Sequence, residues 1–375
     1  MTTEEPLETG LRGIPVGYCT TSKVDPVLGL FYRERPISEL ASWDPERVLF
    51  LLYHGHDPDK GELKAFKADL CKRSFIDRRV IEHIEALPRE GHPMALFSCA
   101  ILILGMFELK NDYREDCLNL IAKLPVITAV MINAHAGWGK TPPSKPELGY
   151  MENFAHMLNK PELTEFFRLY DILHFDHGGG NLSTFVGKAI ASGMEDLYGS
   201  IAGAMNALAG PRHGRANQEC LHFVEQMVEE LGEQATADDV EKHIRDKLAK
   251  KELVYGFGHA VLRVEDPRAT IQYELGQKRF PDHPLIRFAL MIRERGVKVL
   301  KENPKISNPY PNVDAVSGSL LTAAGFGYPE YYTVLFGMSR ACGIATQIVY
   351  ERCIAREGKG TPIVRPKYIY KNLMS

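Results

Sequence analysis

Four stretches of the sequence place a titratable side chain at a corner marked by glycine or proline, beside a predicted helix end. They are HGGGN at 177–181, GPRHGR at 210–215, GFGH at 256–259 and PNVD at 311–314. Loops at helix ends bring side chains and free backbone N–H groups into clefts. One such corner is weak evidence, because an isolated histidine in a turn is usually a surface residue. Three histidines and an aspartate in such corners, with arginines beside them, predict a site for an anionic substrate.

Three arginines near these corners suit the recognition of carboxylates. Arg340 lies inside an apolar helix predicted for residues 333–354, and a buried guanidinium must be paired because an isolated charge is costly in a low dielectric. It either forms an ion pair with a core carboxylate or clamps a substrate carboxylate in bidentate geometry. Arg268 follows a proline and, by itself, would be a solvated surface residue. Arg365 lies in a proline-containing, extended C-terminal tail, which suits a contact with another subunit.

Two further stretches look like ligand sites and are rejected. GKT at 139–141 resembles the end of a phosphate-binding loop, but Ala134 stands where the first glycine belongs, and two prolines follow the threonine. HFDH at 174–177 suggests a metal site, but no second cluster of hard ligands accompanies it. We therefore expect no metal.

The composition is typical of a soluble globular enzyme. The 375 residues are 45% hydrophobic and 25% charged, with a formal net charge of −3, which favours neither nucleic acid nor an acidic membrane surface as a partner. Seven cysteines are scattered singly, without a C-x-x-C pair, which indicates reduced thiols and a cytoplasmic protein.

Two stretches bear on targeting and on membranes. The N-terminal sequence MTTEEPLETG has no apolar stretch, so we expect neither a signal peptide nor a transit peptide. The longest apolar-looking run, at 331–350, is interrupted by Ser339 and Arg340, which predicts a buried helix rather than a membrane span.

Helical periodicity dominates the chain. Apolar residues recur at steps of three and four over 221–231, and Gly232 ends that helix. Thr236 and Asp239 form a capping pair for the next helix. Alternation with a period of two is scarce and is clearest near residues 13–33. The chain is therefore predicted to be mainly α.

Prolines and glycines divide these helices. They predict loops at 143–150 and 303–312. The helices between about residue 210 and residue 325 would then form a smaller domain inserted in a larger one.

Several motifs together resemble those of the citrate synthase family, of the kind found in mitochondria, here as a cytosolic form. They are GLRGIPVGYCTTSKVDPVLGLFYRERPI at 10–37, SIAGAMNALAG at 200–210, GFGHAVLRVEDPR at 256–268, PYPNVDAVSG at 309–318 and VRPK at 364–367. The resemblance implies the all-α citrate synthase fold, in which a smaller helical domain closes over a cleft, and a homodimer. It implies a large domain of residues 1–212 and 326–375 and a small domain of residues 213–325.

The resemblance also implies a reaction, in which acetyl-CoA joins oxaloacetate and citryl-CoA is hydrolysed to citrate and CoA. Asp314 matches the base that removes a proton from the acetyl methyl group. His213 matches the histidine that donates a hydrogen bond to the thioester oxygen, and His259 matches the one that polarises the ketone. The charge that develops on the enol oxygen must be met by such donors in a water-poor cleft.

Substrate-binding residues follow from the same resemblance. The carboxylates of oxaloacetate would be held by His177, Arg268, Arg340 and, acting in the partner's site, Arg365. Coenzyme A would be received by Gly256, Phe257, Gly258, Arg263 and Asn312. Acetyl-CoA is then a substrate, and no cofactor is expected to be tightly bound.

The position of His213 suggests how its imidazole stays neutral. It stands just before a predicted helix, whose positive N-terminal end disfavours imidazolium. A neutral ring can donate a hydrogen bond to the enol oxygen without acting as a strong acid.

The chain departs from the family pattern near the expected CoA site. Arg212 and Arg215 stand where mitochondrial relatives usually carry leucine, and Gly178 replaces a glutamate. The segment 109–116 is shorter than in those relatives, which carry a basic residue there for CoA. We hypothesise that Arg212 or Arg215 supplies part of the missing positive charge. The alternative is that both form surface ion pairs.

The sequence is also compatible with other functions. A 2-methylcitrate synthase would use propionyl-CoA, and one methyl group in an apolar pocket is worth only about 1–3 kcal/mol. Citrate cleavage in the reverse direction would need identical residues. An inactive metabolite sensor would have lost the base or a histidine, and a helical scaffold would have no use for Arg340. Because the family motifs begin within about ten residues of the N-terminus, we expect a simple dimer without a further N-terminal domain.

Overall fold

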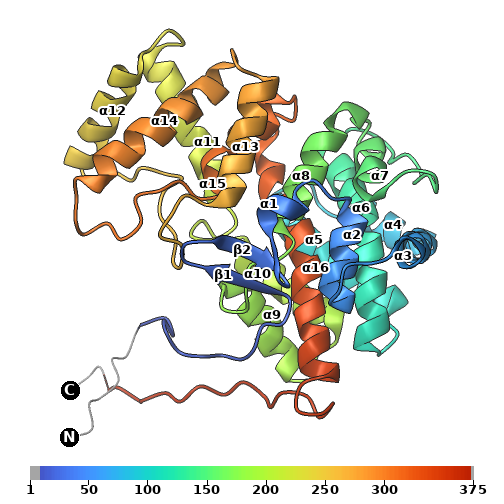
Figure 1. Cartoon of the computed structure of the whole chain (residues 1–375). Helices are drawn as coiled ribbons and strands as arrows, with labels where there is room; N and C mark the ends of the chain where they lie inside the picture. The colour runs from blue at the N-terminus through green and yellow to red at the C-terminus, as the bar shows by residue number, and fades with distance from the viewer. Residues whose placement is uncertain (1–8, 373–375) are drawn as a thin grey trace, which may run out of the picture.

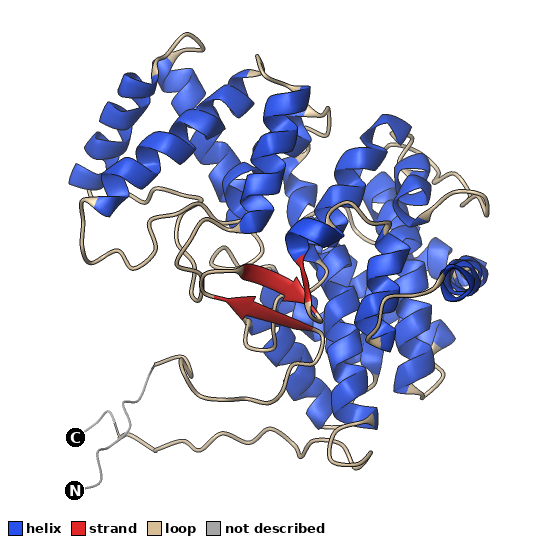
Figure 2. Ribbon diagram, in the orientation of Figure 1, coloured by secondary structure: helices blue, strands red, loops and turns tan. Residues whose placement is uncertain are grey.

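The computed structural model describes residues 9–372, so most of the acidic N-terminal stretch considered above lies outside the described residues. Helices dominate the described chain, and its named strands form one small sheet (Figure 2). The all-α prediction is confirmed. The strands are β1 (Ser22–Asp25), β2 (Gly29–Tyr32) and β3 (Arg35–Pro36). The helices are α1 (Ile37–Leu40), α2 (Pro45–His54), α3 (Lys60–Arg73), α4 (Arg78–Glu85), α5 (Pro93–Glu108), α6 (Tyr113–Ala136), α7 (Tyr150–Met157), α8 (Thr164–His174), α9 (Leu182–Ser192), α10 (Leu197–Leu208), α11 (Ala216–Leu231), α12 (Ala237–Ala249), α13 (Pro267–Arg279), α14 (Pro284–Lys301), α15 (Asp314–Ala323) and α16 (Tyr332–Cys353), with short 3-10 helices at Pro161–Leu163 and Pro329–Tyr331.

Two groups of helices lie side by side (Figure 1). One group consists of α11 to α15, and the other contains α2 to α10 together with α16. The hairpin of β1 and β2 lies between them in this view. The boundaries of a small domain at 213–325 stay a prediction.

Helix α16 forms the centre of the larger group. Its side chains are buried almost without interruption from Tyr332 to Val349, and it packs against α6, α8, α9 and α10. A helix that is apolar on all sides must be surrounded by protein. The sequence prediction of 333–354 differs from the observed helix by one residue at each end. Arg340, only 2% exposed, is therefore held inside the core.

Helix α6, rather than the run at 331–350, is the helix of the described chain that is long and apolar enough to cross a membrane. Its most apolar window has a mean hydropathy of 1.7, and 83% of that window is buried inside the fold. This burial is typical of a core helix.

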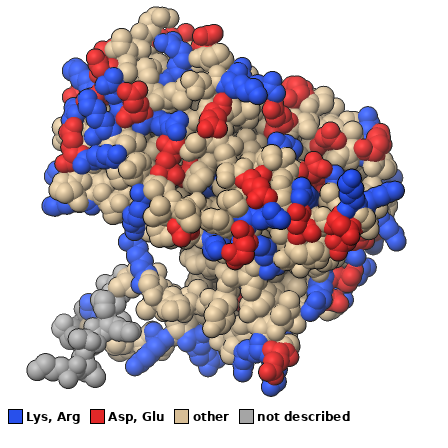
Figure 3. Space-filling model, in the orientation of Figure 1, with Lys and Arg blue, Asp and Glu red and all other residues tan. Residues whose placement is uncertain are grey.

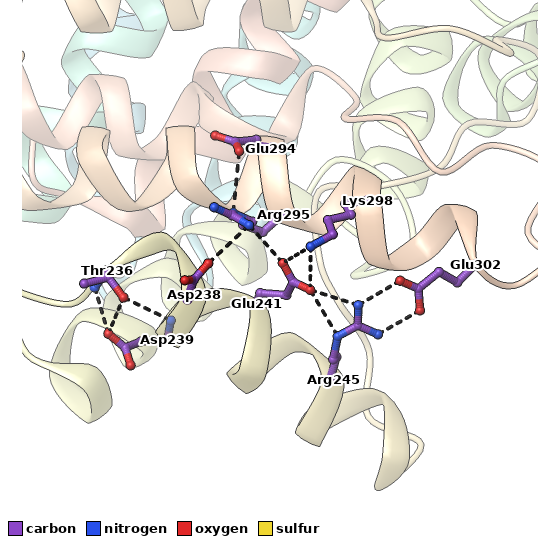
Figure 4. Close-up of polar contacts among 9 residues, drawn as sticks. All are labelled: Thr236, Asp238, Asp239, Glu241, Arg245, Glu294, Arg295, Lys298 and Glu302. Carbon is purple, nitrogen blue, oxygen red and sulfur yellow. Dashed lines mark hydrogen bonds and ion pairs between the residues drawn. The ribbon is translucent and has the colours of Figure 1, made fainter.

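The helices α11, α12 and α14 confirm the signals in the sequence. Gly232 follows α11 with a φ of 78°, and Thr236 and Asp239 form the predicted capping box of α12. Glu241 of α12 then accepts hydrogen bonds from Lys298 of α14 and from Arg245, one turn further along α12 (Figure 4). These ion pairs fasten α12 to α14 on the outer side of this group.

The hairpin of β1 and β2 occupies part of the region where alternation was predicted. The strands pair antiparallel from Ser22 opposite Tyr32 to Asp25 opposite Gly29. The Asp25 carboxylate accepts the backbone N–H groups of two turn residues, which stabilises the turn. The carbonyl oxygen of Pro26, in that turn, accepts the N–H of Arg263 at 2.8 Å, so the hairpin contacts the segment that leads into α13.

The exposed surface carries charges of both signs. On the face in Figure 3, basic and acidic side chains are interspersed over both groups of helices. The described end of the chain, from residue 361 to residue 372, has no helix or strand and runs away from the helices (Figure 1), as its prolines predict.

Candidate active site

A cavity of about 620 Å³ lies where the four glycine- and proline-marked corners meet. Both groups of helices contribute to its wall. The polar residues that line it are His177, Asn181, Arg212, His213, His259, Arg268, Asn312, Asp314 and Arg340. The corners predicted to share one anionic site are thus brought together.

The His213 side chain reaches the N-terminus of α9. Its Nε2 atom lies 3.3 Å from the backbone nitrogen of Ser183 and 2.9 Å from the Ser183 hydroxyl oxygen. A backbone N–H can only donate, so the network assigns the lone pair to Nε2 and the proton to Nδ1. Burial, followed by the charge of Arg340, lowers the pKa of His213 to about 4. The ring is therefore neutral near pH 7, and its Nδ1–H is available as a donor.

From the sequence, the helix that follows His213 is expected to keep this ring neutral. That helix, α11, begins at Ala216, but burial and Arg340 are the leading causes of the lowered pKa. The helical N–H that contacts the ring belongs to α9, which lies about thirty residues earlier in the chain. Tertiary packing, rather than the local dipole, accounts for the neutral ring.

His259 has the opposite tautomer. The N–H groups of Val261 and Leu262 donate to its Nδ1 at 3.0 and 2.9 Å, so the proton lies on Nε2. This Nε2 is 3.3 Å from Nε2 of His177. Burial and, next, the charge of Arg268 lower the pKa of His259 to about 4. His259 therefore presents a neutral N–H donor to the same cavity.

A short backbone bridge joins the segments 256–258 and 310–312 and so places His259 near Asp314. The N–H of Asn312 donates to the carbonyl of Gly256 at 2.9 Å. Gly256 has a φ of 83°, and a Cβ there would lie 2.9 Å from the Cα of Ala315. Glycine is needed at this position for both reasons.

Asp314 is the first residue of α15. Its backbone N–H donates to Oδ1 of Asn312 at 3.0 Å, whereas its own Oδ1 has no hydrogen-bond partner. Burial raises the pKa of Asp314 to about 7, and the charge of Arg268 partly opposes this rise. A carboxylate with a free oxygen and a raised pKa can act as a general base near neutral pH.

Two buried arginines line the other side of the cavity. Arg268 donates from Nε and Nη2 to the carboxylate of Asp266, at 3.0 and 2.6 Å, so it is not the solvated residue that its position alone suggested. Nε of Arg340 donates to the carbonyl of His174 at 2.9 Å, and Arg340 has no ion pair with any described residue. Burial lowers the pKa of Arg340 to about 10, which leaves it charged at neutral pH. Of the two roles considered for Arg340, the ion pair with a core carboxylate is not found.

The HFDH stretch uses its side chains for packing and hydrogen bonds. The ring of His174 stacks on that of Tyr170, with centroids 4.1 Å apart, and its Nδ1 lies 2.7 Å from the Tyr170 carbonyl oxygen. The described residues contain no group of three or more potential metal ligands.

Comparison with known proteins shows the family. The model of the family described as "Citrate synthase, C-terminal domain" matches residues 10–367. The chain belongs to the citrate synthase family. Among curated members of the family, citrate synthase 4, mitochondrial, of Arabidopsis thaliana is 37% identical over 96% of this chain and 80% of its own length. The 2-methylcitrate synthase, mitochondrial, of Yarrowia lipolytica is 38% identical over 96% of this chain and 82% of its own length.

Solved citrate synthase structures have the same fold. The enzyme of Thermotoga maritima superposes with a TM-score of 0.84 at 28% identity, over 99% of this chain and 97% of its own. The enzyme of Thermoplasma acidophilum, solved as a ternary complex with carboxymethyl coenzyme A and oxaloacetate, superposes with a TM-score of 0.85 at 25% identity, over 98% of this chain and 97% of its own. The citrate synthase fold expected from the motifs is confirmed.

Five residues that the family resemblance assigned to substrates do not line the cavity. They are Gly256, Phe257, Gly258, Arg263 and Arg365. The first three form the backbone bridge described above, and the ring of Phe257 packs against Gly296 of α14. Arg263 donates from Nη1 to the carbonyls of Val261 and Leu262, at 3.0 and 2.7 Å. Its guanidinium therefore stabilises the loop that contains it. Arg365 is exposed in the C-terminal tail.

Other cavity residues were not singled out from the sequence. Asn181 ended one of the quoted motifs, and its position as the N-cap of α9 was a signal that could have found it. Val24 of β1 and Phe336 of α16 also line the cavity. These apolar residues carried no sequence signal, because nothing local distinguishes them from core residues. Ser183, which orients His213, was also missed, because its contact with the ring joins residues thirty positions apart.

Proposed function

We propose that this chain condenses acetyl-CoA with oxaloacetate and hydrolyses the resulting citryl-CoA to citrate and CoA. One observation carries the proposal. The unpartnered carboxylate oxygen of Asp314 and the neutral rings of His213 and His259 face one cavity that buried arginines also line. Membership of the citrate synthase family supports the same reaction.

The first step is proton removal from the acetyl methyl group. Asp314 takes the proton, and the electron pair of the C–H bond moves toward the thioester oxygen. Nδ1–H of His213 donates to that oxygen, so the charge that develops there is met by a fixed donor. Because the His213 ring is neutral, it stabilises the developing enolate by a hydrogen bond and keeps its own proton.

The second step forms the carbon–carbon bond. The enolate carbon attacks the ketone carbon of oxaloacetate, while Nε2–H of His259 donates a hydrogen bond to the ketone oxygen. The new hydroxyl gains one proton, which balances the one that Asp314 took from the methyl group. Arg268 and Arg340 hold the substrate carboxylates, and His177 lies beside them. Water then cleaves the thioester, which releases CoA. Coenzyme A is thus a substrate and product, and we propose no tightly bound cofactor.

The test is thiol release from acetyl-CoA, measured with and without oxaloacetate. We expect release only when oxaloacetate is present. A second candidate is 2-methylcitrate synthesis, because the 38% identity to the Yarrowia enzyme is as high as that to curated citrate synthases, which are 37% and 38% identical. The ratio of kcat/KM for acetyl-CoA and propionyl-CoA distinguishes the two functions, and a ratio below one would replace the first proposal by the second. Initial rates with citrate and CoA test the reverse direction.

Of Arg212 and Arg215, Arg212 is better placed to contact CoA with its charge. It is exposed, lines both the catalytic cavity and an adjoining hollow of about 380 Å³, and makes no contact that competes with a ligand. Nε of Arg215 instead donates to the carbonyl of Ala209 at 3.2 Å, at the end of α10. Neither arginine forms an ion pair with a described residue, so the alternative of surface ion pairs lacks support.

Arg212→Leu is expected to raise the KM for acetyl-CoA about two- to fivefold, the range of an exposed charge pair. Arg215→Leu is the matched control, and it should leave that KM unchanged. Steady-state kinetics at saturating oxaloacetate measure both. An equal rise in the two variants, or none in Arg212→Leu, would refute the assignment.

We propose a homodimer in which Arg365 acts in the partner's site. The exposed tail supports this, because Arg365 makes no contact with the cavity of its own chain. Exposed apolar side chains of α5 and α9, among them Met106 and Leu182, are suited to contact a second copy. Sedimentation should therefore give the mass of two chains.

A hybrid dimer tests the assignment of Arg365 directly. We expect Asp314→Asn and Arg365→Leu homodimers each to have low activity. If Arg365 acts in the partner's site, their hybrid contains one complete site and should recover about half of the wild-type activity. Differently tagged chains allow the hybrid to be purified. A hybrid no more active than the mean of the two homodimers would place Arg365 in its own chain's site.

We also propose that the small domain moves relative to the large domain. Residues 213–325 would move against residues 1–212 and 326–375, and the position of the cavity between the two groups of helices supports this closure.

A cytoplasmic location is supported by the seven cysteines, all of which are free thiols.

A further inference from the structure

Asp176 is a buried carboxylate that the proposed chemistry does not use. It is 0% exposed and lies in the loop between α8 and α9, directly before His177. Burying a carboxylate is costly unless its oxygens are hydrogen-bonded. The partners of Asp176 therefore indicate what its burial achieves.

Each oxygen of Asp176 accepts from a different part of the fold. Oδ1 accepts from the His177 backbone N–H at 2.9 Å and from the Gln347 side-chain amide of α16 at 2.8 Å. Oδ2 accepts from the Ser22 hydroxyl of β1 at 2.9 Å and from the hydroxyl of Thr21. With four donors satisfied, the carboxylate is fully occupied and is not a vacant metal ligand.

The same partners also hold the next residues of the loop. The Ser22 oxygen accepts the N–H of Gly178 at 2.7 Å, and the Gln347 amide donates to the carbonyl of Gly178 at 3.1 Å. Two turns before Gln347 on α16 is Arg340. Asp176 thus fixes the His177 loop to the helix that carries Arg340.

Strand β1 is the third element in this arrangement. Thr21 and Ser22 attach its beginning to Asp176, and Val24, two residues further on, lines the cavity. Tyr32 of the paired strand accepts the backbone N–H of Asp176 at 3.2 Å and donates to the carbonyl of Ile172 at 2.8 Å. The N-terminal hairpin is therefore part of the support of the catalytic cavity.

We propose that Asp176 is a positioning residue for oxaloacetate, because its carboxylate fixes His177 and the hairpin relative to the helix of Arg340. This inference rests on the proposed function. Asp176 does not line the cavity and acts through His177 and Arg340, which the proposed function assigns to oxaloacetate. Its replacement should therefore affect the binding of oxaloacetate more than that of acetyl-CoA.

The test compares Asp176→Asn with the wild type. Asparagine keeps the size of the side chain but replaces one acceptor oxygen by a donor, so the four donors are no longer all satisfied. We expect the KM for oxaloacetate to rise about tenfold, the range for losing hydrogen bonds to a charged group, with the KM for acetyl-CoA within about twofold. A merely structural role would lower the melting temperature and kcat without this separation of the two KM values, and would overturn the proposal.

The sign of the change is informative as well. Oxaloacetate is a dianion, so the negative charge of Asp176 by itself opposes its binding. If charge outweighed positioning, Asp176→Asn would lower the KM for oxaloacetate, and that result would also overturn the proposal.

Ser22→Ala keeps the Asp176 carboxylate and removes one of its hydrogen-bond donors. It tests the positioning role of Asp176 if the Asp176→Asn variant does not fold. We expect a rise of about two- to fivefold in the KM for oxaloacetate. Ser42→Ala is the matched control, because Ser42 is exposed and its hydroxyl only donates to the Glu39 carbonyl. An unchanged KM in Ser22→Ala would contradict the proposal. If the wild type showed no oxaloacetate-dependent thiol release, the proposed function itself would fail.

Discussion

Asp314→Asn is expected to abolish oxaloacetate-dependent thiol release almost completely. The carboxamide cannot accept the proton of the acetyl methyl group, and no other carboxylate lines the cavity among the described residues. The loss of a positioned general base lowers kcat by about 10²- to 10⁴-fold. The side chains are equal in size, so the fold should persist, which circular dichroism would verify.

The pH dependence gives a second measure of the same group. Burial raises the pKa of Asp314 to about 7, and a base works only when deprotonated. We therefore expect kcat/KM to be highest above pH 7 and to fall about tenfold for each pH unit below about pH 6. The pKa values of His213 and His259, lowered to about 4, keep both rings neutral across this range, so neither adds a step.

A matched control separates catalysis from the change of side chain. Asp282→Asn makes the same replacement at an exposed residue of the loop before α14, and it should retain wild-type kinetics. If Asp314→Asn kept more than about a tenth of the wild-type kcat, the assignment of the base would be wrong.

His213→Ala is expected to have the next largest effect. The ring supplies the donor for the thioester oxygen, and Ser183 orients it by contacts of 3.3 and 2.9 Å to Nε2. Removing one donor of this type costs about 10²- to 10³-fold in kcat. Because the ring acts on the other substrate, the KM for oxaloacetate should change little.

His222→Ala is the control for this variant. His222 lies on α11, is exposed, and pairs only with Glu225 at 3.1 Å. Stopped-flow measurement of thiol release should give the wild-type rate for this control. A comparable loss in both variants would mean that α11 had been disturbed, and a wild-type kcat in His213→Ala would exclude its role as enol donor.

Several elements could be predicted because their signals are local. The period of apolar residues, the capping pair at Thr236 and Asp239 and the helix stop at Gly232 all act within a few residues. Turns marked by glycine and proline are local signals as well, and they singled out His177, His213, His259 and Asp314 as candidate site residues. The roles of these residues came from the family resemblance and not from the local pattern.

Other features depend on contacts between distant segments. Ser183 sets the tautomer of His213 from thirty positions away, and Asp176 joins β1 to α16 across more than 150 residues on each side. Arg263 closes its own loop, although its place in the motif suggested a CoA ligand. No periodicity or propensity encodes such pairings.

The sequence by itself determined the helical class, the corners and the types of side chain that can do the chemistry, because these depend on residues close together in the chain. Only the tertiary structure decided which nitrogen of each imidazole carries its proton, how far the pKa of Asp314 rises, and which arginines face the cavity. Burial and long-range hydrogen bonds set these properties, and both exist only once the distant segments are packed together.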